Sequence, residues 1–103
     1  MSQGIMFRYA ERKDVGLILE FIRGLARYEK MEQEVVATEE LLEEWIFDRQ
    51  KAEVIFGVAE GREIGFALFF HNFSTFLGRA GIYLEDLYVL PEFRGKGYGK
   101  LYS

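Results

Sequence analysis

The chain has 103 residues, half of them hydrophobic and 17% aromatic, and its 17 Asp and Glu outnumber its 13 Lys and Arg to give a formal charge of −4. A chain of this length and composition can bury one core, so we expect a single domain over residues 1–103. The negative charge argues against nucleic-acid binding, which depends on Lys and Arg at the phosphates. It favours a small cationic partner instead.

Two residue types that often carry chemistry are scarce. Cysteine is absent, which excludes disulfides, thiolate metal sites and cysteine nucleophiles. His71 is the only histidine, so a metal site or a histidine-based triad has too few residues to draw on, and we expect a structural role for it. Neither an N-terminal signal nor a long apolar span is present, and we therefore expect a cytoplasmic protein with no membrane contact.

The first half of the chain predicts a strand and two helices. Residues 5–9 form a short strand candidate. From about Glu11 a helix is expected, with Asp14 in its first turn and apolar residues at helical spacing at Val15, Ile18, Ile22, Leu25 and Ala26. Thr38 is the expected N-cap of a second helix, whose buried stripe would be Leu41, Leu42, Trp45 and Ile46.

The second half predicts a hairpin and a last strand. Residues 52–59 read as a strand and residues 64–71 as its return strand, joined by a tight turn in which Gly61 accepts a positive φ. A looser segment is expected over residues 72–79, before a final strand over residues 81–90. The order β-α-α-β-β-β-α, with antiparallel neighbours, predicts an α+β fold in which helices pack on one sheet.

A glycine loop follows the last strand, which Pro91 ends. It reads Arg94, Gly95, Lys96, Gly97, Tyr98, Gly99, with Lys100 after it. The glycines let successive backbone N–H groups converge on an anion, at a point where a helix would also begin with unpaired donors. Arg94 and Lys96 add positive charge. The spacing fits neither the dinucleotide fingerprint nor a Walker A loop.

The pattern Arg94-x-x-Gly97-x-Gly99 after such a strand resembles the acetyl-CoA loop of the GNAT acetyltransferases. The stretches Leu84-Glu85-Asp86-Leu87-Tyr88-Val89 and Leu25-Ala26-Arg27-Tyr28-Glu29-Lys30-Met31-Glu32 are similar to the spermidine/spermine acetyltransferase branch. The resemblance implies a GNAT-like, mixed but mainly antiparallel sheet. It also implies transfer of an acetyl group from acetyl-CoA, the cosubstrate, to a primary amine of a small cationic molecule, either a polyamine or a lysine-like compound.

The resemblance implies roles for residues of the last strand and its loop. Glu85 would be the general base. The backbone of Leu87 and Val89 would bind the pantetheine arm, and the pyrophosphate would lie on Arg94, Gly95, Lys96, Gly97, Tyr98, Gly99 and Lys100. Asp86 is expected to bind the amine. Because Glu85 and Asp86 are adjacent, a regular strand would place them on opposite faces unless a bulge re-aims one of them.

The segment from residue 28 to residue 44 is rich in Glu and carries a single Lys, Lys30. Such a field could concentrate a polycation, although a run of this kind is also typical of a solvated helix face. Within it, Tyr28, Glu29 and Glu32 match the substrate segment of the polyamine branch, and we expect them to bind substrate.

The chain departs from the family pattern at its end. Family members continue beyond the glycine loop through a helix and further strands, whereas four residues follow Gly99 here. We therefore expect the N-terminal part of a GNAT fold, whose last strand, residues 81–90, presents an unpaired edge. Such an edge favours pairing in a homodimer or completion by the missing C-terminal segment. The alternative function is a non-catalytic module that acts through association with another chain.

Overall fold

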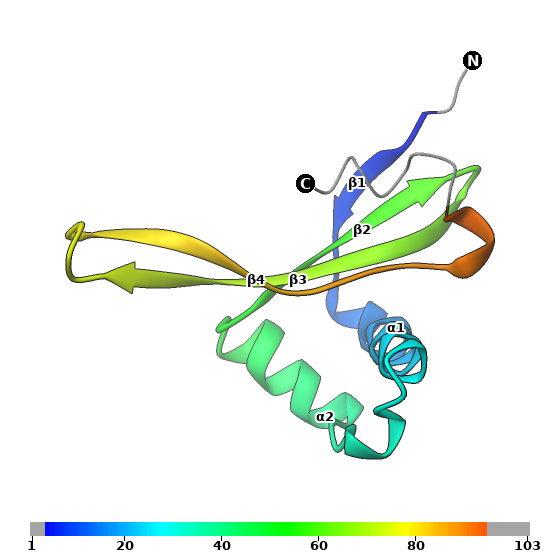
Figure 1. Cartoon of the computed structure of the whole chain (residues 1–103), viewed down its shortest axis with the longest axis horizontal. Coiled ribbons are helices and arrows are strands. Elements are labelled where there is room, and N and C mark those ends of the chain that lie inside the picture. The colour runs from blue at the N-terminus through cyan, green and yellow to red at the C-terminus, as the bar shows by residue number, and fades with distance from the viewer. Residues whose placement is uncertain (1–3, 95–103) are drawn as a thin grey trace.

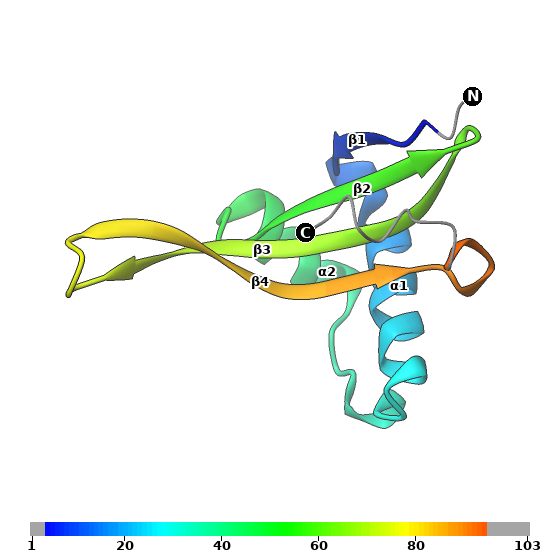
Figure 2. The same cartoon turned by 45° about the horizontal axis from the view of Figure 1, so that its top comes forward.

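The computed structural model describes residues 4–94, and it shows one four-stranded sheet with helices on one of its faces (Figures 1 and 2). All neighbouring strands are antiparallel, in the spatial order β1 (Met6–Tyr9), β2 (Glu53–Ala59), β3 (Arg62–Ser74) and β4 (Arg79–Val89). The helices are α1 (Val15–Tyr28) and α2 (Glu39–Leu42), and the latter continues as a π-helical stretch, Glu43–Asp48. The α+β fold expected from the sequence is confirmed.

Four aromatic rings hold α1 on the sheet. The ring of Phe21 in α1 lies 5.9 Å from that of Phe56 in β2, 5.7 Å from that of Phe66 in β3 and 6.1 Å from that of Tyr88 in β4. All four side chains are buried. Aromatic pairs at such distances stabilise a core beyond the area that they bury. Three strands are thereby tied to one helix, and the carboxyl end of that helix is fixed beside β4.

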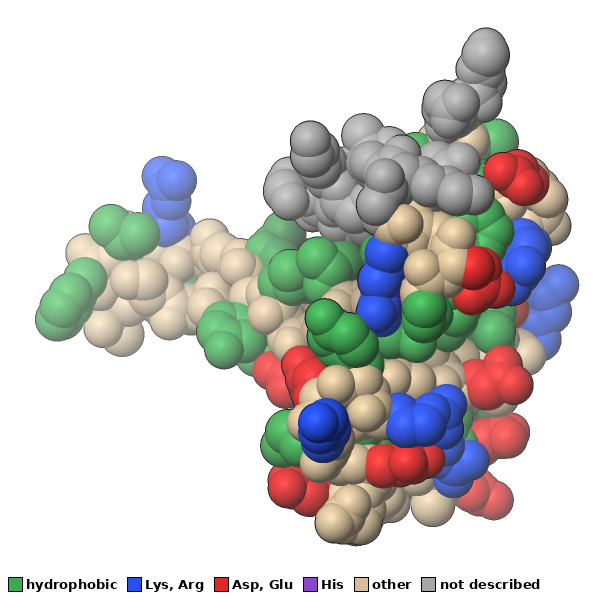
Figure 3. Space-filling view, turned by 45° about the vertical axis from the view of Figure 1, so that its right-hand side comes forward, with side chains coloured by type: hydrophobic (Ala, Val, Ile, Leu, Met, Phe, Trp, Pro, Cys, Tyr) green, Lys and Arg blue, Asp and Glu red, His purple; other side chains and the backbone are tan. Residues whose placement is uncertain are grey.

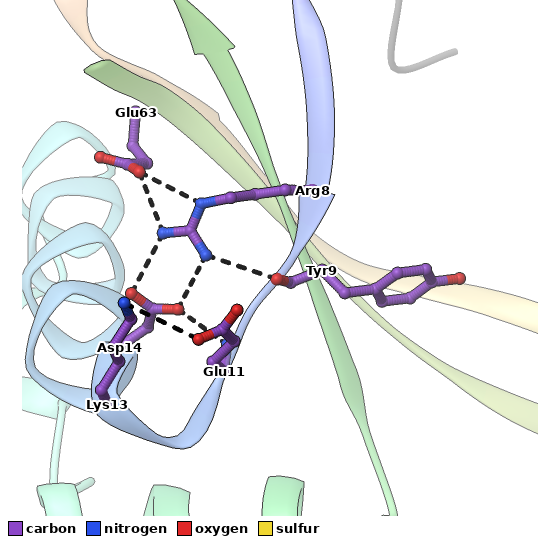
Figure 4. A network of polar contacts seen from close by, with 6 residues as sticks. All are labelled: Arg8, Tyr9, Glu11, Lys13, Asp14 and Glu63. Atoms are coloured by element: carbon purple, nitrogen blue, oxygen red, sulfur yellow. Dashed lines mark hydrogen bonds and ion pairs between the residues drawn. The ribbon is translucent and has the colours of Figure 1, made fainter. Parts of the chain in front are cut away.

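The N-terminal end of α1 is held by an ionic network (Figure 4). Arg8 of β1 donates from Nη1 and Nη2 to the two carboxylate oxygens of buried Asp14, at 2.9 and 3.1 Å, and to Glu63 of β3 at 2.9 Å. Asp14 also accepts the Glu11 N–H at 2.7 Å. Because Asp14 is occupied in this way, residues 12–14 form a 3-10 turn, and the helix begins at Val15 instead of near Glu11 as expected.

The two hairpin turns contain residues in the left-handed region. Glu60 and Gly61 have φ of 55° and 80° between β2 and β3, which confirms the expected tight turn. The segment 72–79 was expected to be loose, and this prediction is wrong. Residues 72–74 pair with residues 79–81, so that the connection shrinks to residues 75–78, with Gly78 at φ 67°.

The second helix begins as predicted but buries less. Thr38 caps it by accepting the Leu41 N–H on Oγ1 at 3.2 Å. Of the expected buried stripe only Ile46 is fully buried, whereas Leu41 and Trp45 are exposed, which corrects that prediction. The change from α-helical to π-helical winding after Leu42 rotates the stripe, and Trp45 instead lies under the guanidinium of Arg49, 4.9 Å from its ring centroid.

Close approach of β3 and β4 requires a glycine in the middle of the sheet. Gly65 pairs with Val89, and a Cβ atom at position 65 would lie 2.5 Å from the carbonyl oxygen of Tyr88. No side chain fits there without a shift of the backbone of β4. Gly65 therefore sets the separation of the two strands just before the chain leaves β4.

Candidate active site

A β-bulge in β4 lies at the two acidic residues of the last strand. Asp86 is opposite Leu68, but the next residue of β3, Phe69, is opposite Leu84. Glu85 is therefore an extra residue with no partner in the ladder. A bulge of this kind re-aims the side chains around it, and Glu85 and Asp86 line the same groove. In a regular strand these two adjacent side chains would lie on opposite faces, so the bulge is what allows both carboxylates to line one groove.

The groove lies between α1, the chain segment after it, and β4. Its volume is about 400 Å³. The chain turns sharply at the end of α1, where Lys30 has φ 60° and Met31 donates its N–H to the Ala26 carbonyl at 2.8 Å, and it then runs back along the groove. The walls are mostly apolar and consist of Ile22, Leu25, Ala26, Met31, Val35, Val36 and Ala37.

Four carboxylates line the same groove. Glu29 caps the end of α1, Glu34 lies in the returning segment, and Glu85 and Asp86 come from the bulge. Among the described residues that line it, none is Lys or Arg. Burial raises the pKa of the half-buried Asp86 carboxyl above its usual value, and the charges of Glu85 and Glu29 raise that pKa further. Within residues 4–94, the groove thus combines acidic side chains that no basic lining residue neutralises with apolar walls.

The outer edge of β4 presents backbone groups next to this groove. Leu90 donates its N–H to Ile64 at 2.7 Å, so Leu90 faces β3. Backbone groups alternate in direction along a strand, and those of Val89 and Leu87 therefore point away from β3. The Val89 oxygen accepts a hydrogen bond from Nε of Arg94 at 2.7 Å, which agrees with this direction. Among the described residues, no strand pairs with that edge.

The remaining predicted site residues lie in different places. Glu32 is exposed and forms an ion pair with Arg27 at 3.0 Å, outside the groove lining. Tyr28 is 67% exposed, and its ring lies under the guanidinium of Arg94. The loop residues Gly95, Lys96, Gly97, Tyr98, Gly99 and Lys100 lie outside the described residues. Their roles stay predictions.

A hollow of similar size, about 380 Å³, lies elsewhere on the molecule. Its lining includes Tyr9, Gln50 and Glu53, and Glu53 is paired with Nε2 of His71 at 2.9 Å. Its one carboxylate is therefore already paired, whereas no residue of the described part of the chain forms an ion pair with the four carboxylates of the groove. Within residues 4–94, no cluster of three or more His, Cys, Asp or Glu side chains is suited to hold a metal ion, and no helix is long and apolar enough to cross a membrane.

Sequence reasoning missed two parts of the groove. Glu34 belongs to the acidic run, but nothing local separates it from neighbouring glutamates that face solvent. The apolar wall formed by Val35 and Val36 was also missed, because it depends on the path of the chain after α1. The apolar pair Val35 and Val36, which follows an acidic stretch, was the one signal in the sequence for this wall.

The family model for the acetyltransferase (GNAT) family matches residues 19–102. The chain belongs to the GNAT acetyltransferase family. This match runs from α1 through the groove residues to the end of the glycine loop, so the resemblance seen in the motifs is confirmed.

Individual GNAT relatives agree with this assignment. The chain is 39% identical over 104 residues to a thialysine N-epsilon-acetyltransferase of Bos taurus, a match that covers 92% of this chain and 61% of the relative. An L-ornithine N5-acetyltransferase of Arabidopsis thaliana is 49% identical over 37 residues, 36% of this chain and 16% of that protein. The chain thus spans about three fifths of the length of the longer-matching relative.

Solved structures support the GNAT fold. One crystal structure of a predicted acetyltransferase from Clostridium acetobutylicum with acetyl-CoA has a TM-score of 0.76, at 17% identity, over 96% of this chain and 68% of that chain. At this identity the likeness concerns the fold alone. The sheet and helices described above are therefore those of the GNAT fold.

Proposed function

We propose that this chain is the amine-binding and cosubstrate-binding part of an N-acetyltransferase, which transfers the acetyl group of acetyl-CoA to a primary amine of a small cationic molecule. The observation that carries the proposal is the bulge at Glu85, which turns two adjacent carboxylates into one acidic groove. Membership of the GNAT family and a relative named for acetylation of thialysine support it.

The groove has the chemistry that such a substrate needs. An ammonium group would supply the positive charge that Asp86 and its acidic neighbours lack, while a methylene stem would pack on Leu25 and Val35. Four carboxylates along an apolar wall suit a lysine-like molecule with one terminal amine as well as a polyamine. The name of the Bos taurus relative favours the lysine-like substrate.

Glu85 is proposed as the general base. Acetyl transfer needs a neutral amine, so the bound ammonium group first gives up a proton, which Glu85 would accept directly or through a water molecule. The freed lone pair of the nitrogen then bonds to the thioester carbonyl carbon, the carbon–sulfur bond breaks, and the second proton that the nitrogen loses goes to the departing thiolate, which leaves as the free thiol. The outward N–H and C=O groups of Leu87 fit the amide-bearing arm of the cosubstrate, and the glycine loop beyond Arg94 would take its pyrophosphate.

The test is Glu85→Gln, which keeps the shape of the side chain and removes its basicity. We expect turnover with thialysine, lysine or spermidine to fall about 10²- to 10⁴-fold, with loss of the base-dependent limb of the pH profile. Release of the free thiol measures turnover, and Glu20→Gln, at an exposed position of α1 outside the groove lining, is the matched control. Parent turnover by Glu85→Gln at every pH would show that Glu85 is a rim residue.

A second candidate function is a non-catalytic module. The observation that favours it is the unpaired edge of β4 among the described residues, which could bind a strand of another chain or of a second copy. Calorimetry with coenzyme A, followed by the thiol-release assay, separates the two candidates. Binding of coenzyme A without turnover of any of the three amines would favour the module.

A further inference from the structure

We propose that Arg94 is a positioning residue, whose guanidinium clamps the end of β4 onto the end of α1 and so fixes the start of the glycine loop relative to the acidic groove. The proposal rests on the proposed function, because it concerns how the two binding regions are held together. It gives Arg94 a different task from the direct phosphate contact that its place in the loop motif implies.

Three contacts form the clamp. The guanidinium carbon of Arg94 lies 4.3 Å from the centroid of the Tyr28 ring and 5.1 Å from that of the Tyr88 ring. Its Nε donates to the carbonyl oxygen of Val89 at 2.7 Å. A planar guanidinium stacks on aromatic rings in a way that the compact ammonium group of lysine does not reproduce. Both rings and one fixed hydrogen bond therefore determine where Arg94 lies.

The two rings come from the two elements that build the groove. Tyr28 is the last residue of α1, directly before Glu29, and Tyr88 lies two residues after Asp86 in β4. Arg94 thus joins the end of the helix, which carries one groove carboxylate, to the strand that carries two more. It is also the last described residue before the glycines.

Tyr88 is itself held in place by α1. Its ring lies 6.1 Å from that of Phe21, and its hydroxyl group lies so close to α1 that a Cβ atom at Gly24 would be 2.8 Å from it. The absence of a side chain at Gly24 lets Tyr88 reach this position. The clamp is therefore built on the aromatic core, and a displacement of Arg94 would need either ring to move.

The experiment separates a clamp from a charge. Coenzyme A is titrated calorimetrically into the full 103-residue chain and into its variants Arg94→Lys, Tyr28→Leu and their combination. If Arg94 acts as a clamp, each single variant weakens coenzyme A binding by about twofold to thirtyfold, the range that a cation–π contact corresponds to. The double variant should bind coenzyme A no more weakly than whichever single variant has the lower affinity.

Two controls complete the design. Tyr28→Phe keeps the ring and loses the hydroxyl group, so the clamp predicts parent affinity. Arg49→Lys removes a matched guanidinium stacked on Trp45 in the second helix, and it should leave coenzyme A binding unchanged. Parent affinity in Arg94→Lys, no effect of Tyr28→Leu, or additive effects in the double variant would each overturn the clamp.

The same variants give a second reading by urea unfolding. If the parent chain binds no coenzyme A, the proposed function of this chain fails, and the clamp is then judged by the unfolding midpoints alone. If the shift of the unfolding midpoint in the double variant differs from the sum of the shifts of Arg94→Lys and Tyr28→Leu, the contact between the two residues is supported. A shift equal to that sum overturns it. Failure of the clamp and failure of the proposed function are thereby distinguished.

Discussion

The two halves of β4 differ in what covers them. On one side of the bulge, Tyr88 and Val89 are buried against α1 and β3, whereas on the other side Ile82 is 65% exposed. The ladder explains the difference, because β2 pairs with β3 only as far as Phe69, and beyond it β3 and β4 form a two-stranded ribbon. Figure 3 shows hydrophobic side chains on this projecting hairpin. Strand pairing alone does not bury a side chain; a second layer is needed.

The groove lies at the boundary between these halves. The bulge at Glu85 falls where the three-stranded ladder gives way to the two-stranded ribbon. A rigid half next to it positions Asp86, while the interruption of the ladder frees Glu85 to turn toward the same groove. The site therefore depends on the difference between the halves and not on either half alone.

The largest effect should come from removing a core ring in the buried half. Phe66→Ala leaves a cavity against Phe21, and we expect the free energy of unfolding to fall by about 3–5 kcal/mol. Phe73→Ala in the ribbon, where the ring is 65% exposed, should change it by less than about 0.5 kcal/mol. Urea unfolding of both variants measures the contrast, and similar losses would show that the ribbon is covered by another layer.

A smaller effect is expected at the other end of α1. Hydrogen bonds from Arg8 lower the pKa of Asp14 despite its burial, so the ionised carboxylate contributes stability above its ordinary pKa of about 3.9 and loses it as the pH falls through its lower folded value. Asp14→Asn should cost about 1–3 kcal/mol at pH 7. The deficit should shrink as the pH is lowered below about 4. A deficit that is independent of pH would show that packing, and not charge, sets the role of Asp14.

A smaller loss of stability than that of Asp14→Asn should come from the bulge itself. Deletion of Glu85 leaves the pairs on either side of it, Asp86 with Leu68 and Leu84 with Phe69, and makes the strand regular. We expect the free energy of unfolding to change by no more than about 1 kcal/mol, the typical cost of a single mutation. If the proposed function holds, thiol release with thialysine, lysine or spermidine should be lost nonetheless. A deletion variant that unfolds at the parent midpoint and retains turnover would separate the bulge from the chemistry.

Local signals in the sequence predicted several features correctly. Gly61 predicted the turn between β2 and β3, Thr38 predicted the cap of the second helix, and the spacing of apolar residues predicted α1. Each of these features depends on a few neighbouring residues. The glycine loop and the acidic strand indicated the family. These features need no knowledge of which distant residue faces which.

Non-local geometry produced the failures. Residues 72–74 include polar types that favour turns, yet cross-strand hydrogen bonds hold them in β3. The exposure of Trp45 follows from a change of helical winding that no propensity predicts. The bulge at Glu85 depends on the register between β3 and β4. The sequence alone therefore could not predict it, and indicated only that a bulge was needed for Glu85 and Asp86 to share one face. Glu34 lines the groove because the chain runs back along it after α1.

The lack of a side chain at Gly65 affects the groove, although Gly65 does not line it. Because its missing side chain sets how closely β3 approaches Tyr88, any larger residue at this position would push β4 outward. The displacement would reach Tyr88 and Val89, and with them Arg94 and the carboxylates beside the bulge. A position that has no functional group, on a strand that contributes no side chain to the groove lining, therefore helps to set the geometry of the groove. In a set of natural variants, the identity of residue 65 would report on the geometry of the groove.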